Sequence, residues 1–566
     1  MISIKDVRFV SQSDLLGEGG CVFAQNKTCC QICNMGPCQF VTGGNLSEGI
    51  CGASAETVIA RNFCRMVAGG VSTRSVYAVN KLLSFKSVLE QGDIDIDPKF
   101  FKRAYRIFRS SSFKDAADLD HVALSWCEEA IKLLGQQNGD CTSWPYLPEE
   151  RREIWSRFGW TPRGTNREVV EAMHRTHIGV DQEYHSIMSH SSRCALSDLW
   201  CSSIISAILT DFNDSSYDAN EIDVDVHLLK SRCINVLFYR CDKRNTGEIK
   251  EKLKEFGQHD LNFLEVEGSD TGESVHVSRI FTYLVTGALD VIIVGDQRLF
   301  NLFSFHASCF HTRVFDTAAL KIDNGFLKDI ILTYKSRNMR VFIPDSPVLL
   351  PVKPFFSLID GLKTDRTDSL GRRLSQAITN NNLKGIVALV GCIDRHDPLI
   401  HQKVVKEFLA RDILVLSAGC STFLLGNAGM FNMDIEPLLG PDIKRFYEAT
   451  GIYPIINMGV CSEVSRILAL FSEMLSGKTD FTRVPAVVFM PSWRSEQIIS
   501  TGHSLVSSGI TTILGDSFPI GPENKATQYI TDSLKDINGA SWIHCKSNNV
   551  LELIDDISRY LEDIAG

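Results

Sequence analysis

From about residue 230 onward, short apolar segments alternate with amphipathic ones. CINVLFY, LNFLEVE and LDVIIVGD have the pattern of strands, and segments with helical spacing separate them. A second cycle runs through KGIVALVGC, ILVLSAGC, YPIINMGVC and VPAVVFM. Apolar strands that alternate with helices are typical of parallel sheets covered on both faces. The pattern therefore predicts an α/β fold with two Rossmann-like, doubly wound domains.

The preceding part of the chain has mainly helical periodicity, beginning with apolar residues at helical spacing over Ala53–Leu83. A chain of 566 residues is also too long for one hydrophobic core. We therefore expect a helical domain with the N-terminal cysteines over 1–228, a middle Rossmann-like domain over 229–375 and a C-terminal Rossmann-like domain over 376–566.

Net charge and hydropathy exclude some functions. The formal net charge is −10, which argues against a nucleic-acid surface, because such a surface needs a basic stripe. No apolar run approaches the roughly 18 residues of a membrane span. The N-terminal segment MISIKDVRFVSQSDLL lacks the basic start and apolar core of a signal peptide. We expect a cytoplasmic protein that acts on a small molecule.

Six of the eighteen cysteines lie between residues 21 and 51. In a long chain this clustering indicates metal ligation rather than disulfide bonds, which suits a reducing, anaerobic setting. Four thiolates satisfy one [4Fe-4S] cluster. A tight loop can supply Cys30, Cys33 and Cys38, and Cys51 completes the set just before a helix. Zinc is the alternative, but its ligands usually come as two CxxC pairs.

Two cysteines of this run, Cys21 and Cys29, remain. Two thiolates cannot fill a four-ligand cluster, whereas two copies from a twofold-related subunit can. The sequence thus predicts a homodimer with a cluster on its symmetry axis. Two cysteines per subunit suit either a [4Fe-4S] or a [2Fe-2S] cluster, and two purely structural thiols are the alternative.

Three cysteines of the C-terminal domain each end an apolar strand: Cys392, Cys420 and Cys461. In an open parallel sheet the carboxyl ends of the strands line the ligand crevice. A single cysteine there is more often a small buried hydrophobe. Three at the same relative position predict a metal-binding triad, and Cys241 ends a strand of the middle domain in the matching position.

The cysteine run, followed by GICGASAETVIARNFCRM, resembles the catalytic subunit of nickel–iron carbon monoxide dehydrogenases, relatives of the hybrid cluster proteins. The resemblance continues through RTHIGVDQEY, CFHTRVFDT, NMGVCSEVSRIL and PSWRSEQ, over nearly the whole chain. It implies a homodimer with a subunit-bridging cluster on Cys21 and Cys29. It also implies a relay cluster on the other four N-terminal cysteines, and an active-site cluster on the three strand-end cysteines.

Several ligand positions depart from that family. Cys241 stands where the family has a histidine ligand, and Asp270 or Glu273 falls where it has a thiolate. Arg298 occupies the position of a further cysteine. Carboxylate in place of thiolate favours iron with oxygen ligands over a soft nickel site. Hybrid cluster proteins mix sulfur and oxygen bridges, use carboxylate ligands and reduce hydroxylamine, so the ligand chemistry leans toward them.

Proton-transfer positions differ as well. A helix of stepped histidines in the family becomes Arg74, Tyr77 and Asn80, and the catalytic lysine becomes Gln497. These replacements remove the acids that carbon dioxide chemistry uses.

The first hypothesis is a reductase of a small oxygen-bearing substrate such as hydroxylamine, at an iron–sulfur cluster with oxygen bridges. A ferredoxin-like protein would exchange electrons with it. Arg298, Glu273, Glu463 and His311 are the candidate catalytic residues, and each polar residue has a structural alternative. The other hypotheses are a nickel-dependent carbon monoxide dehydrogenase and a non-turnover redox carrier or sensor of oxygen or nitric oxide.

Overall fold

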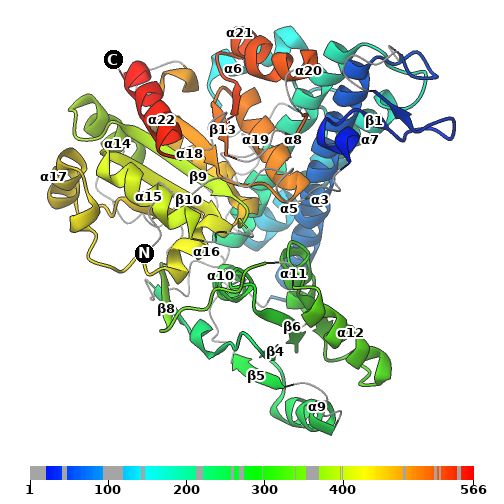
Figure 1. Ribbon diagram of the computed structural model, residues 1–566, viewed down its shortest axis with the longest axis vertical. Helices are drawn as coiled ribbons and strands as arrows, with labels where there is room; N and C mark the ends of the chain where they lie inside the picture. Colours follow the sequence, from blue (N-terminus) through cyan, green and yellow to red (C-terminus); the bar gives the residue numbers. More distant parts are fainter. Residues whose placement is uncertain are drawn as a thin grey trace.

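The computed structural model confirms the predicted fold class, a helical N-terminal part followed by two domains built on parallel sheets (Figure 1). It describes residues 21–40, 48–92, 119–141, 147–211, 221–255, 260–266, 273–295, 297–337, 339–351, 369–394, 397, 399–475, 480–515, 519–521, 524–544 and 550–565. The three domain limits remain predictions. No helix in this described part is long and apolar enough to cross a bilayer.

The helical part is built around two long helices that run side by side in the same direction. Thr57 near the start of the first donates to the Gln182 carbonyl just before the second (2.7 Å), and Arg74 farther along pairs with Asp198. Its elements are α2 (Val22–Gln25), β1 (Cys29–Cys30), β2 (Cys38–Gln39), α3 (Ala55–Gln91), α5 (Leu119–Gly135), α6 (Glu149–Phe158), α7 (Thr165–Arg175) and α8 (Tyr184–Asp211).

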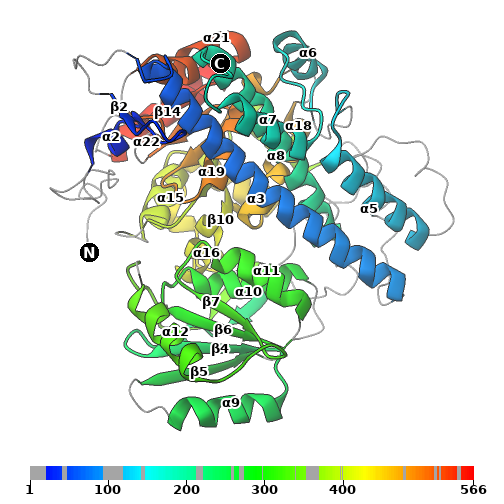
Figure 2. The ribbon, with the colours of Figure 1, turned by 90° about the vertical axis from the view of Figure 1, so that its right-hand side faces the viewer.

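Helix α3 crosses the molecule from the cysteine loop to the middle domain (Figure 2). It begins at the N-cap Ser54, whose hydroxyl accepts the Thr57 N–H (3.2 Å). A Cβ atom at Gly70 would lie 2.6 Å from Ser500 Oγ, so only glycine lets the C-terminal domain approach this closely. The helical part therefore packs directly on the last domain.

The middle domain has a four-stranded parallel sheet in the order β5-β4-β6-β7. Every residue of β4 and β6 is buried, as expected for strands covered on both faces. Helices α10 and α11 lie between this sheet and the C-terminal domain, and α9 lies at the far end (Figure 2). The elements are β3 (Glu221–Val224), β4 (Ile234–Tyr239), α9 (Lys243–Glu255), β5 (Leu261–Val266), α10 (Glu273–Leu284), β6 (Leu289–Val294), α11 (Gln297–Ala307), β7 (Arg313–Asp316), α12 (Asn324–Lys335) and β8 (Val348–Pro351).

The C-terminal domain has a six-stranded parallel sheet in the order β11-β10-β9-β12-β13-β14. The strand order reverses between β9 and β12, and ligands of such folds bind at that point. The elements are α14 (Leu370–Thr379), β9 (Gly385–Gly391), α15 (Ile400–Ala410), β10 (Ile413–Gly419), α16 (Cys420–Asn427), α17 (Pro441–Thr450), β11 (Ile455–Asn457), α18 (Ser465–Met474), β12 (Ala486–Met490), α19 (Glu496–Ser507), β13 (Thr512–Leu514), α20 (Lys525–Gln528), α21 (Leu534–Asn538), β14 (Trp542–His544) and α22 (Val550–Ala565).

The middle and C-terminal domains meet through α10 and α16. The rings of Phe281 and Phe423 stack with their centroids 4.9 Å apart, and Asn427 Nδ2 donates to the Thr282 carbonyl (3.4 Å). All three parts of the molecule thus converge near the carboxyl edge of the C-terminal sheet.

Candidate metal centres

The N-terminal cysteine loop folds back on itself between β1 and β2. Cys30 pairs with Cys38 across this short antiparallel ribbon. Gly36 lies in the turn, and a Cβ atom there would be 3.1 Å from the Cys30 carbonyl oxygen and 3.5 Å from that of Cys33. Cys38 and Cys51 pack against the same small apolar core. The structure therefore brings together the four cysteines predicted to hold one cluster, and their role as ligands remains a prediction.

The thiol of Cys51 lies in a positively charged environment. Burial acts to raise its pKa, but the Ala53 backbone N–H, the Arg61 guanidinium and Gln182 outweigh burial and leave the pKa below its usual value. Arg61 Nη1 is 3.9 Å from Cys51 Sγ, and its Nη2 donates to the Asp181 carbonyl (2.8 Å). Stabilisation of the thiolate is what an iron–sulfur ligand requires.

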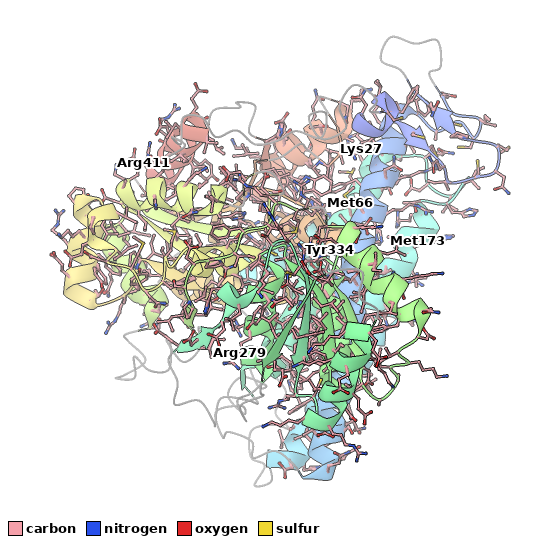
Figure 3. The ribbon with its side chains drawn as sticks, turned by 60° about the horizontal axis from the view of Figure 1, so that its bottom comes forward. Lys27, Met66, Met173, Arg279, Tyr334 and Arg411 are labelled. Carbon is pink, nitrogen blue, oxygen red and sulfur yellow. The ribbon has the colours of Figure 1, made fainter. Side chains whose placement is uncertain are left out.

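The other two N-terminal cysteines lie nearer the surface. Cys21 is exposed and Cys29 is half-buried. Asn62 on α3 donates to the Cys29 carbonyl (3.2 Å) and to that of Lys27 (3.0 Å), which fixes this segment to the long helix. In Figure 3 the label of Lys27 shows where this segment lies, on the opposite side of the view from Arg411 of the C-terminal domain.

The three strand-end cysteines follow three neighbouring strands, β9, β10 and β11. Gly391 and Gly419 pair in register, so Cys392 and Cys420 leave adjacent strands at the same level. Gly419 has φ +67°, and a Cβ atom on it would be 3.1 Å from the Cβ atom of Cys461. The predicted convergence at the carboxyl edge is thus present in the structure.

These thiols act on one another electrostatically, and a fourth cysteine joins them. Burial and then the charges of Cys392, Cys461 and Cys309 hold the pKa of Cys420 well above its usual value. Burial, with the charges of Cys461 and Cys392, likewise raises the pKa of Cys309. Thiols that oppose one another's ionisation favour a bound metal centre, because metal ions neutralise thiolate charge.

The arrangement of these groups does not form a site for one metal ion. In the part of the chain that the structure describes, no three cysteine, histidine or acidic side chains are arranged to chelate a single metal ion. Cluster ligands bind different irons and therefore stand farther apart.

Cys392 lies where the strand order reverses. Its N–H donates to the Ser492 carbonyl (3.0 Å), which places it against the loop between β12 and α19. Burial raises the pKa of Cys392, and hydrogen bonds from the backbone of Arg494 and Ser495 oppose that rise. Arg494 Nε and Nη2 are buried and have no hydrogen-bond partner among the residues that the structure describes. Unsatisfied guanidinium donors beside a thiol fit an anionic group, such as a thiolate-bound cluster, at this position.

Cys461 is held by a buried ionic network. Arg74 Nη2 donates to the Cys461 carbonyl (3.3 Å) and to Thr501 Oγ1 (2.9 Å), while its Nη1 pairs with Asp198. Burial raises the pKa of Asp198 even though Arg74 opposes that rise. Arg74, at a position where the resemblance implies a histidine, thus holds the loop that carries Cys461.

Two predicted catalytic residues have the contacts of structural groups. Glu463 pairs with Arg466 and accepts the Val460 N–H (2.9 Å), so it caps the turn that presents Cys461. His311 Nε2 is 3.0 Å from Asp290 Oδ1, and Arg337 also binds that carboxylate. Asp290 lies near the amino end of β6, away from its carboxyl end.

The other predicted site residues of the middle domain either have separate contacts or are not fully described by the structure. The Cys241 thiol donates to the Ile293 carbonyl (3.2 Å) and packs on the core of the middle sheet. No interaction described for it involves the four gathered thiols. Glu273 begins α10 and Arg298 lies in the first turn of α11, but neither side chain is among the described ones. Asp270 lies outside the described residues.

Three residues near the thiols were missed from the sequence: Cys309, Arg494 and His401. Cys309 is in the CFHT motif and Arg494 in PSWRSEQ, so motif resemblance could have flagged both. His401 on α15 is fully buried, neither ring nitrogen has a partner that meets hydrogen-bond geometry, and burial lowers its pKa to about 4. The backbone of Cys392 and the charge of Asp394 oppose that lowering, which places this ring beside the metal-site strand.

A pocket of about 330 Å³ lies between α3 and α11. It is lined by two of the stepped positions, Tyr77 and Asn80, and by the nearly buried Lys81. Tyr77 also stacks on Phe305 (centroids 4.1 Å apart), and its hydroxyl is 3.5 Å from His306 Nε2. The stepped face of α3 therefore runs from the Cys461 loop, at Arg74, to this pocket.

Comparison with known proteins agrees with this architecture. The sequence model described as the Prismane/CO dehydrogenase family matches residues 28–239 and 281–546. Carbon monoxide dehydrogenase 1 of Methanosarcina acetivorans is 30% identical, with 92% of this chain and 89% of the relative aligned. Carbon monoxide dehydrogenase 2 of Carboxydothermus hydrogenoformans is 25% identical over 92% and 90% of the two chains.

Solved structures give the same result. The nickel-free carbon monoxide dehydrogenase of Thermococcus sp. AM4 superimposes with a TM-score of 0.74 at 25% identity, covering 97% of this chain and 93% of that one. Carbon monoxide dehydrogenase IV of Carboxydothermus hydrogenoformans shares the fold with a TM-score of 0.74 at 20% identity, over 98% and 96% of the two chains. With the cysteines gathered at two places in this scaffold, the chain belongs to the Prismane/CO dehydrogenase family of iron–sulfur oxidoreductases.

Proposed function

We propose that the protein is an iron–sulfur reductase that transfers two electrons to a small oxygen-bearing substrate such as hydroxylamine. The observation that carries the proposal is the gathering of the strand-end thiols beside Arg494, two of whose guanidinium donors have no hydrogen-bond partner among the described residues. The stepped histidine and the catalytic lysine that the resemblance would place nearby are Arg74 and Gln497 in this chain. The site is therefore equipped to bind and stabilise negative charge rather than to protonate carbon dioxide.

The reaction is NH2OH + 2 H⁺ + 2 e⁻ → NH3 + H2O. The N–O bond breaks and nitrogen takes up two electrons. One proton goes to nitrogen to form ammonia, and the other goes to the departing hydroxyl to form water. When bound, an iron–sulfur cluster on Cys392, Cys420 and Cys461 would supply the electrons and a Lewis-acidic iron, and oxygen bridges in it would suit this substrate. Nickel has no role in this reaction.

Arg494 stabilises the departing oxygen. Its Nε and Nη2 donors are buried and unpartnered, so no existing hydrogen bond has to break before they bind an oxygen that gains negative charge. A guanidinium keeps its proton at all working pH values. Arg494 therefore orients the substrate and stabilises charge, while the protons come from water.

Electrons reach the site from the N-terminal cysteines. Cys30, Cys33, Cys38 and Cys51 hold a [4Fe-4S] relay cluster in this proposal. Cys21 and Cys29 share a second cluster with the same residues of another copy, which makes the protein a homodimer. The exposure of Cys21 supports such sharing. A ferredoxin-like protein is the proposed donor, and the cytoplasm is the proposed location.

Nickel-dependent oxidation of carbon monoxide is the second candidate. It is favoured by the match to carbon monoxide dehydrogenase 1 over 92% of this chain. The reaction CO + H2O → CO2 + 2 H⁺ + 2 e⁻ runs electrons in the opposite direction. It needs a proton acceptor at the site, and the replacements at Arg74 and Gln497 argue against one there.

A paired anaerobic assay separates the candidates. Protein with full iron content is given reduced methyl viologen with hydroxylamine, or oxidised methyl viologen with carbon monoxide, and Cys420→Ser serves as the inactive control. We expect hydroxylamine to oxidise the dye far faster than in the control, and carbon monoxide to have no effect. Rapid dye reduction by carbon monoxide would overturn the proposal. Full cluster content without either reaction would overturn it in favour of a redox carrier or sensor.

A further inference from the structure

The resemblance to carbon monoxide dehydrogenases places a cysteine at the start of helix α11. This chain instead has a cysteine just after the end of that helix. Arg298 lies in the first turn of α11, and Cys309 follows its last turn. The interval is about three helical turns, so the two positions lie at different levels of the domain. A ligand moved from one end of α11 to the other would approach the metal centre from a different side.

Aromatic packing places the end of α11 beside the strand-end cysteines. The ring of Phe281 contacts His306 (centroids 4.6 Å apart) and Phe423 (4.9 Å). The Cys309 N–H donates to the His306 carbonyl (3.3 Å), and Phe423 lies one turn after Cys420 on α16. Both cysteines are therefore about one helical turn from residues that touch the same ring.

Cys309 lies in the turn that follows α11 and is solvent-accessible. Burial of its thiol group nevertheless raises its pKa. The charges of Cys461 and Cys392 reach it, and its own charge reaches Cys420. An accessible thiol among three strand-end thiols is free to bind a metal centre placed between them.

We propose that Cys309 is the fourth thiolate ligand of the active-site iron–sulfur cluster, joining Cys392, Cys420 and Cys461. The inference rests on the metal centre of the proposed function. It explains how the site tolerates Arg298 at the start of α11, because four thiolates already satisfy a cluster.

The contacts of Cys241 support the same choice. Its thiol donates to the Ile293 carbonyl (3.2 Å), an interaction that a metal-bound thiolate cannot make. Among its described interactions, the Cys309 thiol donates no hydrogen bond to a backbone carbonyl of the middle sheet.

Three variants of the full-length protein test the proposal: Cys309→Ser, Cys241→Ser and the control Cys233→Ser. Cys233 is also half-buried in the middle domain. No interaction described for it involves Cys309, Cys392, Cys420 or Cys461. Each is purified anaerobically, and iron and sulfide per chain are measured together with Mössbauer and EPR spectra. The N-terminal cluster signals serve as an internal standard in each sample.

We expect Cys309→Ser to lose or alter the active-site signals while the N-terminal signals remain, and Cys233→Ser to match the parent protein. Unchanged spectra in Cys309→Ser, or loss in Cys241→Ser alone, would overturn the proposal. If Cys420→Ser also left the spectra unchanged, the metal centre of the proposed function would fail as well.

Anaerobic alkylation of the unmodified holoprotein gives a second readout that needs no variant. Iodoacetamide followed by peptide mass spectrometry should leave Cys309 unlabelled despite its accessibility, and should label it after the iron is removed with a chelator. Labelling of Cys309 in the intact holoprotein would contradict a role as a ligand.

Discussion

The two groups of cysteines are built in opposite ways. The N-terminal group comes from one short loop. The second group, the strand-end cysteines with Cys309, comes from residues as far apart in the sequence as Cys309 and Cys461. Nearby cationic and amide groups lower the pKa of Cys51, whereas burial and like charge raise the pKa of Cys420. The first arrangement favours a thiolate without a bound metal, whereas the second favours neutral thiols unless a metal centre, as proposed above, neutralises their charge.

This contrast suits two tasks. A local loop near the surface can exchange electrons with a partner without reorganising the fold. A site whose thiols depend on the packing of several domains can enclose a substrate and exclude water. If the two groups are independent, a substitution in one should leave the metal centre of the other unchanged.

The largest effect is expected from Cys420→Ser. Cys420 receives the charges of three other thiols, so its loss should abolish the active-site cluster and lower hydroxylamine turnover by at least about 100-fold. The N-terminal cluster signals should persist in EPR spectra. Simultaneous loss of both sets of signals would show that the two groups are not independent.

Arg74→Leu should destabilise the strand-end region strongly. It leaves the fully buried Asp198 without its partner, at a cost of about 3–5 kcal/mol in the free energy of unfolding. The double variant with Asp198→Leu should recover much of that loss. Lys86→Met, farther along α3 in an exposed pair with Glu128, is the matched control and should leave thermal unfolding unchanged.

Arg494→Gln should slow turnover without removing the cluster. The substitution deletes the unpartnered guanidinium donors, and we expect kcat to fall about 10–100-fold while iron content and the EPR spectrum are kept. Arg494→Lys keeps the charge and should retain part of the rate. An unchanged kcat in Arg494→Gln would remove this residue from the proposed site.

The smallest effect is expected from Arg61→Gln. It removes the cation beside Cys51, which raises the pKa of that thiol and loosens its hold on iron. Loss of iron from the N-terminal cluster to a chelator should become about 10-fold faster, while the strand-end cluster stays intact. Equally faster loss of iron from both clusters would contradict the independence of the two groups.

Much of the fold was predictable because the strands have nearly continuous apolar runs. β4, β6, β9, β10 and β12 all lie within the predicted segments and are fully buried. The convergence of Cys392, Cys420 and Cys461 followed from the same pattern, since residues that end neighbouring parallel strands share one edge.

Other features of the site depend on packing between domains. Cys309 lies in the turn after α11, and the contacts of Phe281 with His306 and Phe423 bring that turn toward the sheet of another domain. The rule that selected Cys392 also selected Cys241, whose thiol donates to the Ile293 carbonyl; both ligand roles remain predictions. The strand pattern predicts at which edge of a sheet a residue lies. The relative orientation of two domains depends on the packing of side chains between them.

Anomalous diffraction from anaerobic crystals, recorded at the iron and nickel absorption edges, would locate and identify any metal between the gathered thiols. We predict an iron cluster within bonding distance of Cys309, Cys392, Cys420 and Cys461, with no nickel signal. Nickel at that position, or no metal between these thiols, would contradict this prediction.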